Sequence, residues 1–191
     1  MEGYPNAYAV GELIYFRHPT EEDARGTWHS WLSDPVTTRY LVAQNWPNSV
    51  EQQVEFVRSL EPYGSRMALA IVAKNEQRHI GIAGLSSIDY INRTAHVSVL
   101  IGEAEYRKGP FALEAYQLLL EVAFLRLNLR MVISAAVADN VAVRSIHERC
   151  GFREKGRIEN MFWADGSYRD NVISVVTQEE WIRGNSAEQD A

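Results

Sequence analysis

The sequence predicts a single α/β domain in which helices flank a mixed sheet. Strand-like and helical segments alternate along the chain, three extended runs follow one another through short polar turns, and one long segment keeps the three-and-four apolar spacing of a buried helical face. With 191 residues, 46% of them hydrophobic and 23% charged, the chain can bury one sizeable core. We expect one domain over residues 1–182 and a frayed polar tail over residues 183–191.

The first third of the chain reads as one strand followed by two helices. Leu13–Arg17 has the β-branched and aromatic content of a strand. Thr20 is placed to cap a helix that reaches Leu32, just before an Asp-Pro pair. Ser49, with Gln52 three residues later, forms a capping-box pattern that predicts a second helix.

The middle of the chain reads as an antiparallel meander followed by a long helix. Met67–Lys74, Ile80–Ile88 and Ala95–Ile101 are extended runs separated by polar turns. From Phe111 to Leu127 the apolar residues recur on one helical face.

The last third reads as a strand, a helix and two closing strands. Asp139 or Asn140 is placed to cap the helix, and Gly151 ends it in a left-handed conformation. The strands are Arg130–Val137, Phe152–Ile158 and Asn171–Thr177. The expected order is therefore β-α-α-β-β-β-α-β-α-β-β.

Composition excludes several classes of function. A formal net charge of -6 without a basic stripe argues against a nucleic-acid partner. The acidic balance suits a cationic substrate, although solubility explains it more readily. No apolar stretch approaches the roughly 20 residues that a membrane-spanning helix needs. One cysteine excludes an internal disulfide, and without a signal-peptide pattern at the start we expect a cytoplasmic protein.

The loop before the long helix has the composition of an anion site. Arg107 and Lys108 supply positive charge, Gly109 permits close backbone approach, and Pro110 is tolerated in a first helical turn. Backbone N–H groups at a helix N-terminus lack internal partners and attract a diphosphate. An ordinary capped helix has the same pattern, so this signal is weak alone.

A second segment strengthens the interpretation of this loop as an anion site. The loop and helix read YRKGPFALEA, about twenty-five residues later comes NVAVRSIHERCGF, and DGSYRDNVISVVTQEEW follows. Together these segments resemble the GCN5-related N-acetyltransferase (GNAT) superfamily, in the branch of ribosomal-protein alanine, spermidine and amino-sugar N-acetyltransferases. Residues 95–181 carry the motifs, whereas the first 60 residues match in element order only. The resemblance implies a GNAT fold, acetyl-coenzyme A as cosubstrate and an amine acceptor.

The resemblance also implies a set of cofactor-binding residues. In the family, loop amides hold the coenzyme A pyrophosphate, which here assigns Arg107, Lys108, Gly109, Pro110, Phe111 and Ala112. Pro110 stands where the family usually has glycine, so one amide donor is missing. A strand backbone pairs with pantetheine and an asparagine contacts the cofactor arm, which assigns Val97, Val99, Leu100, Ile101 and Asn140.

Amine acetylation poses two proton problems. The ammonium must lose a proton before it attacks, because its pKa is about 10.4. The resemblance places His96 where this branch often has a glutamate, and an imidazole is a reasonable base near pH 7. Asp89, Glu103 and Glu105 are competing bases, and a structural role for His96 is an open alternative.

The departing thiolate needs a proton donor. The superfamily commonly uses a tyrosine whose position is held here by His147, with Ser145 as a neighbouring alternative. These two positions lie about 200 degrees apart on a helix, so only one can face the thiol. A structural role for His147 is equally compatible with the sequence.

Other residues have features of functional sites. Cys150 is more readily a small buried residue than a nucleophile. The five histidines have no metal-ligand spacing, so we expect no metal. Four aromatic residues fall where the family builds its acceptor pocket, and they form either that pocket or a packed cluster: Trp28, Trp31, Tyr40 and Trp46.

We therefore expect an N-acetyltransferase in which the amine attacks the thioester directly, in a ternary complex. A coenzyme A-binding module without activity is the alternative, because of the loop proline and the missing tyrosine. A preference for a longer acyl chain is a further possibility. The strand Asn171–Thr177 and its hairpin suggest a homodimer.

Overall fold

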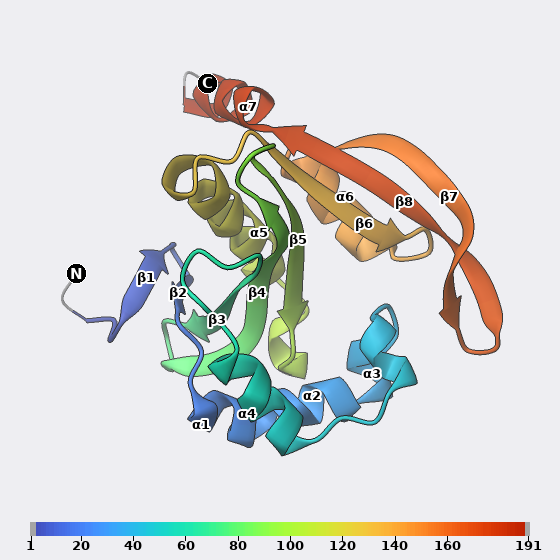
Figure 1. The fold of residues 1–191 in the computed structure, drawn as a ribbon. Helices are drawn as coiled ribbons and strands as arrows, with labels where there is room; N and C mark the ends of the chain where they lie inside the picture. Colours follow the sequence, from blue (N-terminus) through green and yellow to red (C-terminus); the bar gives the residue numbers. More distant parts are fainter. Residues whose placement is uncertain (1–2, 190–191) are drawn as a thin grey trace.

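The structure, a computed structural model, describes residues 3–189 and contains an eight-stranded mixed sheet. The strand order is β1-β2-β3-β4-β5-β6-β8-β7 (Figure 1), and in the described residues every neighbouring pair is antiparallel except β5 and β6. The strands are β1 (Ala7–Val10), β2 (Ile14–Arg17), β3 (Met67–Ala73), β4 (Arg78–Asp89), β5 (Thr94–Ile101), β6 (Met131–Val137), β7 (Arg153–Ala164) and β8 (Ser167–Thr177). The predicted meander is confirmed as β3-β4-β5.

Helices cover both faces of the sheet. One face is covered by α5 (Phe111–Glu121), its continuation η4 (Val122–Arg126) and α6 (Val141–Arg149). The N-terminal helices lie on the other face of the sheet: α1 (Glu21–Asp23), η1 (Ala24–Trp28), α2 (His29–Ser33), α3 (Pro35–Thr38), η2 (Val42–Asn45) and α4 (Val50–Arg58). The remaining helices are η3 (Ala104–Tyr106) and α7 (Gln178–Gln189).

Two cores follow from this layering. The larger joins alternate residues of β2 to β6 to the apolar face of α5, which is why that helix has an apolar repeat. The smaller joins Trp28 and Trp31 to Val54 and Val57 of α4, with Ile82 of β4 packed against them. Since Ile82 alternates with Ala83 of the larger core, the two cores lie on opposite faces of the sheet.

The first predicted helix is broken in the structure. Thr20 caps it as expected, accepting from the backbone N–H of Asp23. The chain then passes through the π-helical turn η1, where Gly26 leaves helical geometry (φ -80, ψ -128), before α2 resumes. Glycine tolerates this break because it has no Cβ. The capping box of Ser49 and Gln52 is confirmed at α4.

Several elements were absent from the prediction, among them β1, α3, α7 and the short helices η2 and η3. β1 comes before the expected first strand, and α3 follows directly on α2 because Asp34 accepts from the backbone N–H groups of Val36 and Thr37. The tail expected to fray after residue 182 continues as α7 as far as Gln189, and residues 190 and 191 lie outside the described residues. Trp181, in the first turn of α7 and before the expected tail, packs on the main core.

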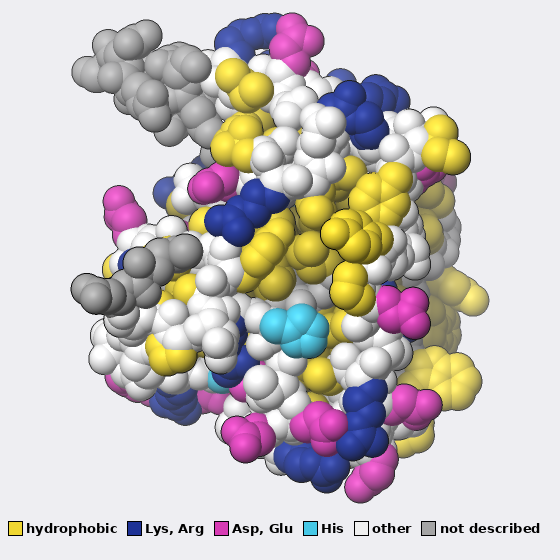
Figure 2. Space-filling model, turned by 60° about the vertical axis from the view of Figure 1, so that its left-hand side comes forward, with side chains coloured by type: hydrophobic (Ala, Val, Ile, Leu, Met, Phe, Trp, Pro, Cys, Tyr) yellow, Lys and Arg dark blue, Asp and Glu magenta, His cyan; other side chains and the backbone are white. Residues whose placement is uncertain are grey.

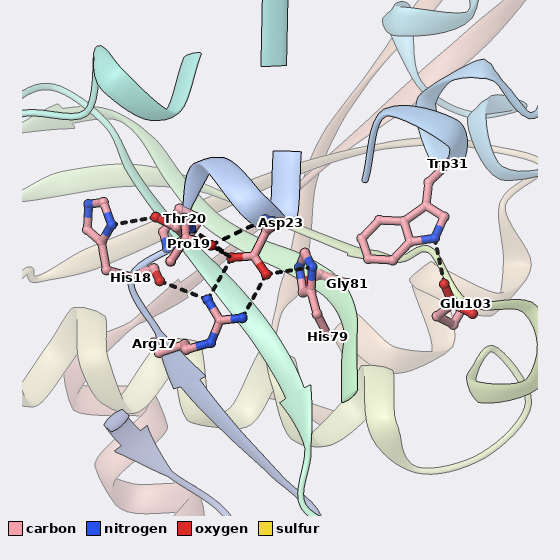
Figure 3. A network of polar contacts seen from close by, with 9 residues as sticks. All are labelled: Arg17, His18, Pro19, Thr20, Asp23, Trp31, His79, Gly81 and Glu103. Atoms are coloured by element: carbon pink, nitrogen blue, oxygen red, sulfur yellow. Dashed lines mark hydrogen bonds and ion pairs between the residues drawn. The ribbon is translucent and has the colours of Figure 1, made fainter. Parts of the chain in front are cut away.

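A buried ionic network anchors the N-terminal helices to the sheet (Figure 3). Arg17 of β2 donates twice to Asp23, at 2.6 Å and 2.7 Å, and His79 Nδ1 of β4 lies 3.2 Å from Asp23 Oδ1. Burial alone would raise the pKa of Asp23, but hydrogen bonding from Arg17 and the neighbouring charges bring that pKa below its usual value. Nearby, Trp31 donates to Glu103 at 2.9 Å.

Candidate active site

The central opening of the sheet lies between β5 and β6. The two strands pair in parallel only where Thr94–His96 meets Met131–Ile133, and beyond these residues they diverge (Figure 1). A cavity of about 280 Å³ fills the gap, lined by both strands, the N-terminal parts of α5 and α6, and residues of α3 and the segment after it. The divergence exposes strand backbone to a ligand, which a continuous sheet would hide.

The N-terminus of α5 closes one end of this cavity and forms an anion seat. Pro110 is its N-cap, one position earlier than expected, and no side chain caps the helix. The first-turn amides from Phe111 onward therefore lack helical partners. Gly109 has φ +141, a conformation that favours glycine, and Lys108 is exposed beside it. These features fit a diphosphate.

Arg107, expected on the diphosphate, lines the cavity and also ties two elements together. Its guanidinium donates to the carbonyl of Gly102 at 2.6 Å and to that of Ile101 at 3.3 Å. It also donates to Thr37 Oγ1 and lies 3.5 Å from Asp34 Oδ2. Arg107 lines the cavity, but its hydrogen bonds hold α3 against the end of β5.

The other expected cofactor residues divide into two groups. Those that line the cavity are Val97, Val99, Leu100, Ile101, Ala112 and Asn140. Asn140 also caps α6, its Oδ1 accepting from the backbone N–H of Val143 at 3.3 Å. Lys108, Gly109, Pro110 and Phe111 form the adjoining loop and helix start, and Phe111 packs edge-on against Tyr106.

His96 lies on the face of β5 opposite α5. Ala95 and Val97 are buried in the main core, whereas His96 between them is exposed. Side chains two residues apart share a face of a strand, so His96 lies on the same side as Ser98, with about 7 Å between the two positions along the strand. Ser98 lines the cavity. His96 is thus just outside the cavity, on the open face of the sheet.

The three competing bases are engaged elsewhere. Asp89 accepts from the backbone N–H groups of Ile91 and Asn92 in the β4–β5 turn. Glu103 and Glu105 both accept from Arg78, and Glu103 also accepts from Trp31. The structure does not bring these three carboxylates to the cavity.

The structure separates the two candidate acids. His147 is 3% exposed, and its Nε2 lies 3.0 Å from Ser134 Oγ of β6. Burial lowers the pKa of His147 to about 4, so the ring is neutral near pH 7. Ser145 is exposed and points away from the core. Ser134, not His147, lines the cavity.

Sequence reasoning missed Ser134. It is the one hydroxyl in the apolar run MVISAAV, and a polar side chain within such a strand needs a partner when it is buried. That signal was present, but only the fold shows that α6 supplies the partner.

The remaining candidates have clear positions. Cys150 is buried and burial raises the pKa of its thiol to about 12, which fits a small packed residue. Trp28 and Trp31 are core residues, Tyr40 lines the cavity, and Trp46 is 74% exposed. The four expected aromatics therefore do not form one cluster.

A second hollow of about 370 Å³ lies beside β1, between β3, the end of β4 and the segment after α4. Figure 2 turns the left-hand side of Figure 1, where β1 lies, toward the reader and shows hydrophobic side chains gathered on that face. No helix N-terminus contributes to its described lining. It therefore lacks the anion seat that distinguishes the cavity between β5 and β6.

The described residues offer neither a metal site nor a membrane-spanning helix. Residues 3–189 contain no cluster of three or more His, Cys, Asp or Glu side chains suited to a metal ion. No helix within the described part of the chain has the length and apolar character to cross a membrane.

Comparison with known proteins shows the family. The acetyltransferase (GNAT) domain family matches residues 14–153. Spermidine N(1)-acetyltransferase of Vibrio cholerae is 28% identical over 112 residues, covering 59% of this chain and 64% of that protein. The putative ribosomal N-acetyltransferase YdaF of Bacillus subtilis is 30% identical over 101 residues, covering 53% of this chain and 55% of that protein.

Solved structures show the same fold. The crystal structure of spermidine N-acetyltransferase from Vibrio cholerae in complex with CoA and spermine has a TM-score of 0.83 at 21% identity, covering 90% of this chain and 99% of that one. This confirms the predicted fold class. Because the family match extends over most of the chain, the chain belongs to the GNAT acetyltransferase family and is an N-acetyltransferase that uses acetyl-coenzyme A.

Proposed function

We propose that this enzyme acetylates a primary amine of a small molecule or of a protein N-terminus, by direct attack on the thioester in a ternary complex. The observation that carries the proposal is the cavity between β5 and β6, which ends at the uncapped N-terminus of α5. A diphosphate on that helix start places an attached acyl chain along β5.

The acceptor approaches from the open face of the sheet. His96 lies on that face and accepts the proton of the attacking amine, directly or through one water. Attack by the amine itself needs no enzyme nucleophile, and the protonated, buried thiol of Cys150 supplies none. The enzyme contributes position and proton transfer, with no covalent intermediate.

A polyamine is the first acceptor to test. The Vibrio cholerae relatives are named for spermidine, and the net charge of -6 attracts a polycation.

A protein N-terminus is the second candidate. The Bacillus subtilis relative is named as a putative ribosomal N-acetyltransferase. A hollow of about 600 Å³ lies beside α3 and η2, with the exposed Trp46 in its wall. An open hollow of this size accommodates a peptide as readily as a small amine.

Two measurements test the function. Calorimetry with acetyl-coenzyme A should show binding, and absence of both heat and thermal shift at millimolar ligand would reject the assignment. A panel of spermidine, amino sugars, aminoglycosides and peptides with free N-termini, read by thiol release, should identify the acceptor. Binding without transfer to any amine would indicate a non-catalytic module, and faster reaction with propionyl or succinyl thioesters would indicate a longer acyl donor.

We also propose the cytosol as the site of the reaction and a homodimer as the working form. A single cysteine favours a reducing compartment. β7 is an edge strand, and its hairpin with β8 exposes Met161, Trp163 and Tyr168, the kind of surface that a second copy covers. Light scattering coupled to size exclusion measures the mass, and a strictly monomeric enzyme would contradict the dimer.

A further inference from the structure

A buried hydroxyl lines the cavity at the point where β5 and β6 begin to diverge. Ser134 is the first residue of β6 beyond the parallel pairing with β5, it is 3% exposed, and it lines the cavity. Val132, two residues earlier on the same strand, packs in the core beneath α5. Ser134 therefore faces the side of the sheet that carries α5 and α6, opposite to His96.

His147 holds this hydroxyl in place. Its Nε2 lies 3.0 Å from Ser134 Oγ, and its ring is packed between Tyr116 and Phe152, with centroid distances of 5.2 Å and 5.0 Å. A neutral imidazole carries one N–H. With that hydrogen on Nε2, His147 donates to Ser134 Oγ and leaves the serine O–H free to point into the cavity.

We propose that Ser134 donates a hydrogen bond to the thioester sulfur as the carbon–sulfur bond breaks, and that His147 positions it. The proposal rests on the acetyl-transfer function above and names a residue for it. The parallel pairing of β5 and β6 ends just before Ser134. At that point the Ser134 hydroxyl lies on one face of the sheet, and the amine approaches from the other, open face.

The step balances without an alkoxide. The amine nitrogen forms a bond to the acyl carbon and gives its proton to His96 or to water. The carbon–sulfur bond breaks, and its electron pair leaves with sulfur. Ser134 keeps its proton throughout and stabilises the thiolate through the hydrogen bond, until a solvent proton converts the thiolate to the thiol.

Ser134→Ala tests the donor, with Ser174→Ala as a matched control. Ser174 is the cross-strand neighbour of Ser134 on β8, is also buried, and is outside the described lining of the cavity. Loss of one hydrogen bond to a developing charge should lower kcat about 10- to 100-fold while KM for acetyl-coenzyme A changes little. Ser174→Ala should keep wild-type kcat.

A spectroscopic measurement separates this role from a structural one. Ultraviolet titration of coenzyme A bound to the enzyme reports the thiolate, and a donor at sulfur lowers the pKa of the bound thiol. In Ser134→Ala that pKa should rise by about one unit, a tenfold shift in the equilibrium. This readout needs no acceptor, so it stays informative even if no amine in the panel reacts.

Variants of His147 complete the test. His147→Gln keeps a hydrogen-bonding group near the position of Nε2 and should retain more of kcat than His147→Leu.

Unchanged kcat and unchanged thiol pKa in Ser134→Ala, in an enzyme whose wild type transfers acetyl groups, would overturn the inference and leave the proposed function intact. Loss of both properties in Tyr116→Phe but not in Ser134→Ala would assign the donor to the phenol of Tyr116, which also lines the cavity, and would overturn it as well.

Discussion

The two faces of the sheet differ sharply beside the cavity. On the face covered by α5 and α6, Ser134, Tyr116 and His147 are buried, and His147 contacts each of the other two. On the opposite face His96 and Ser98 are exposed, and Trp46 stands 74% exposed near the neighbouring hollow. The groups proposed to meet the cosubstrate are therefore held by packing, whereas those proposed to meet the acceptor are exposed.

The difference has a physical cause. Leaving-group chemistry is the same for every acceptor, so a buried hydroxyl fixed by one histidine serves it with little reorganisation. The open face depends instead on short helices joined by the break at Gly26 and held to the sheet through Asp23. Changes on the two faces should therefore have different consequences.

The largest effect should come from breaking the anchor of the open face. Asp23→Asn removes the carboxylate that pairs with the half-buried guanidinium of Arg17 and faces His79. Removing one partner of a fully buried pair costs about 3–5 kcal/mol, and this half-buried pair should lose somewhat less, so the unfolding midpoint in urea should still fall clearly. The exposed pair of Arg58 and Glu21 supplies the control, and Arg58→Ala should shift the midpoint little.

The same variant has a pH signature. Because the folded-state pKa of Asp23 is lowered, its contribution to stability is present above the unfolded-state value of about 4 and is lost as pH falls through the folded-state pKa. Wild type and Asp23→Asn should therefore converge in stability in acid. A difference that stays constant down to pH 2 would refute the role assigned to this carboxylate.

A smaller effect is expected at the anion seat, on binding alone. Gly109→Val places a β-branched residue at φ +141, which costs about 1–3 kcal/mol, so the Kd for acetyl-coenzyme A should rise roughly 10- to 100-fold. The nearest atom to an added Cβ is 3.6 Å away, so the effect comes from backbone strain and not from a clash. Gly156→Ala, at a glycine with open space around it, is the control for calorimetry and should bind normally.

On the open face, His96→Ala should lower kcat about tenfold near pH 7. The deficit should shrink as pH rises toward the pKa of the acceptor amine, about 10.4, because a free amine needs no base. A pH profile of kcat against wild type measures this. Undiminished turnover from pH 6 to 9 would remove His96 from the mechanism.

The smallest effect is expected at Cys150. Its thiol is buried and protonated, with a pKa raised to about 12, so Cys150→Ala should keep kcat and lose only some packing. Alkylation of the native enzyme should likewise leave activity in place. A dead but folded Cys150→Ala enzyme would reopen a covalent mechanism.

Much of the fold was predictable because its signals are local. The capping residues Thr20, Ser49 and Asn140 stand next to the helices that they start, and the meander follows from short turns between extended runs. The π-helical break after Asp23 was not predicted, because a single Gly26 is compatible with an unbroken helix as well as with a break, and the helix after residue 182 was not predicted because its sequence is polar.

For the site, the sequence by itself determined the loop ahead of α5, with its glycine and its uncapped helix start, because a helix terminus and a left-handed glycine are properties of consecutive residues. Only the tertiary structure decided which side chains reach the cavity. Arg107 lines the cavity while it also bonds to α3, His147 lies behind Ser134, and Ser145 points to solvent. Those outcomes depend on strands and helices far apart in the chain meeting at one place, and no local pattern encodes that meeting.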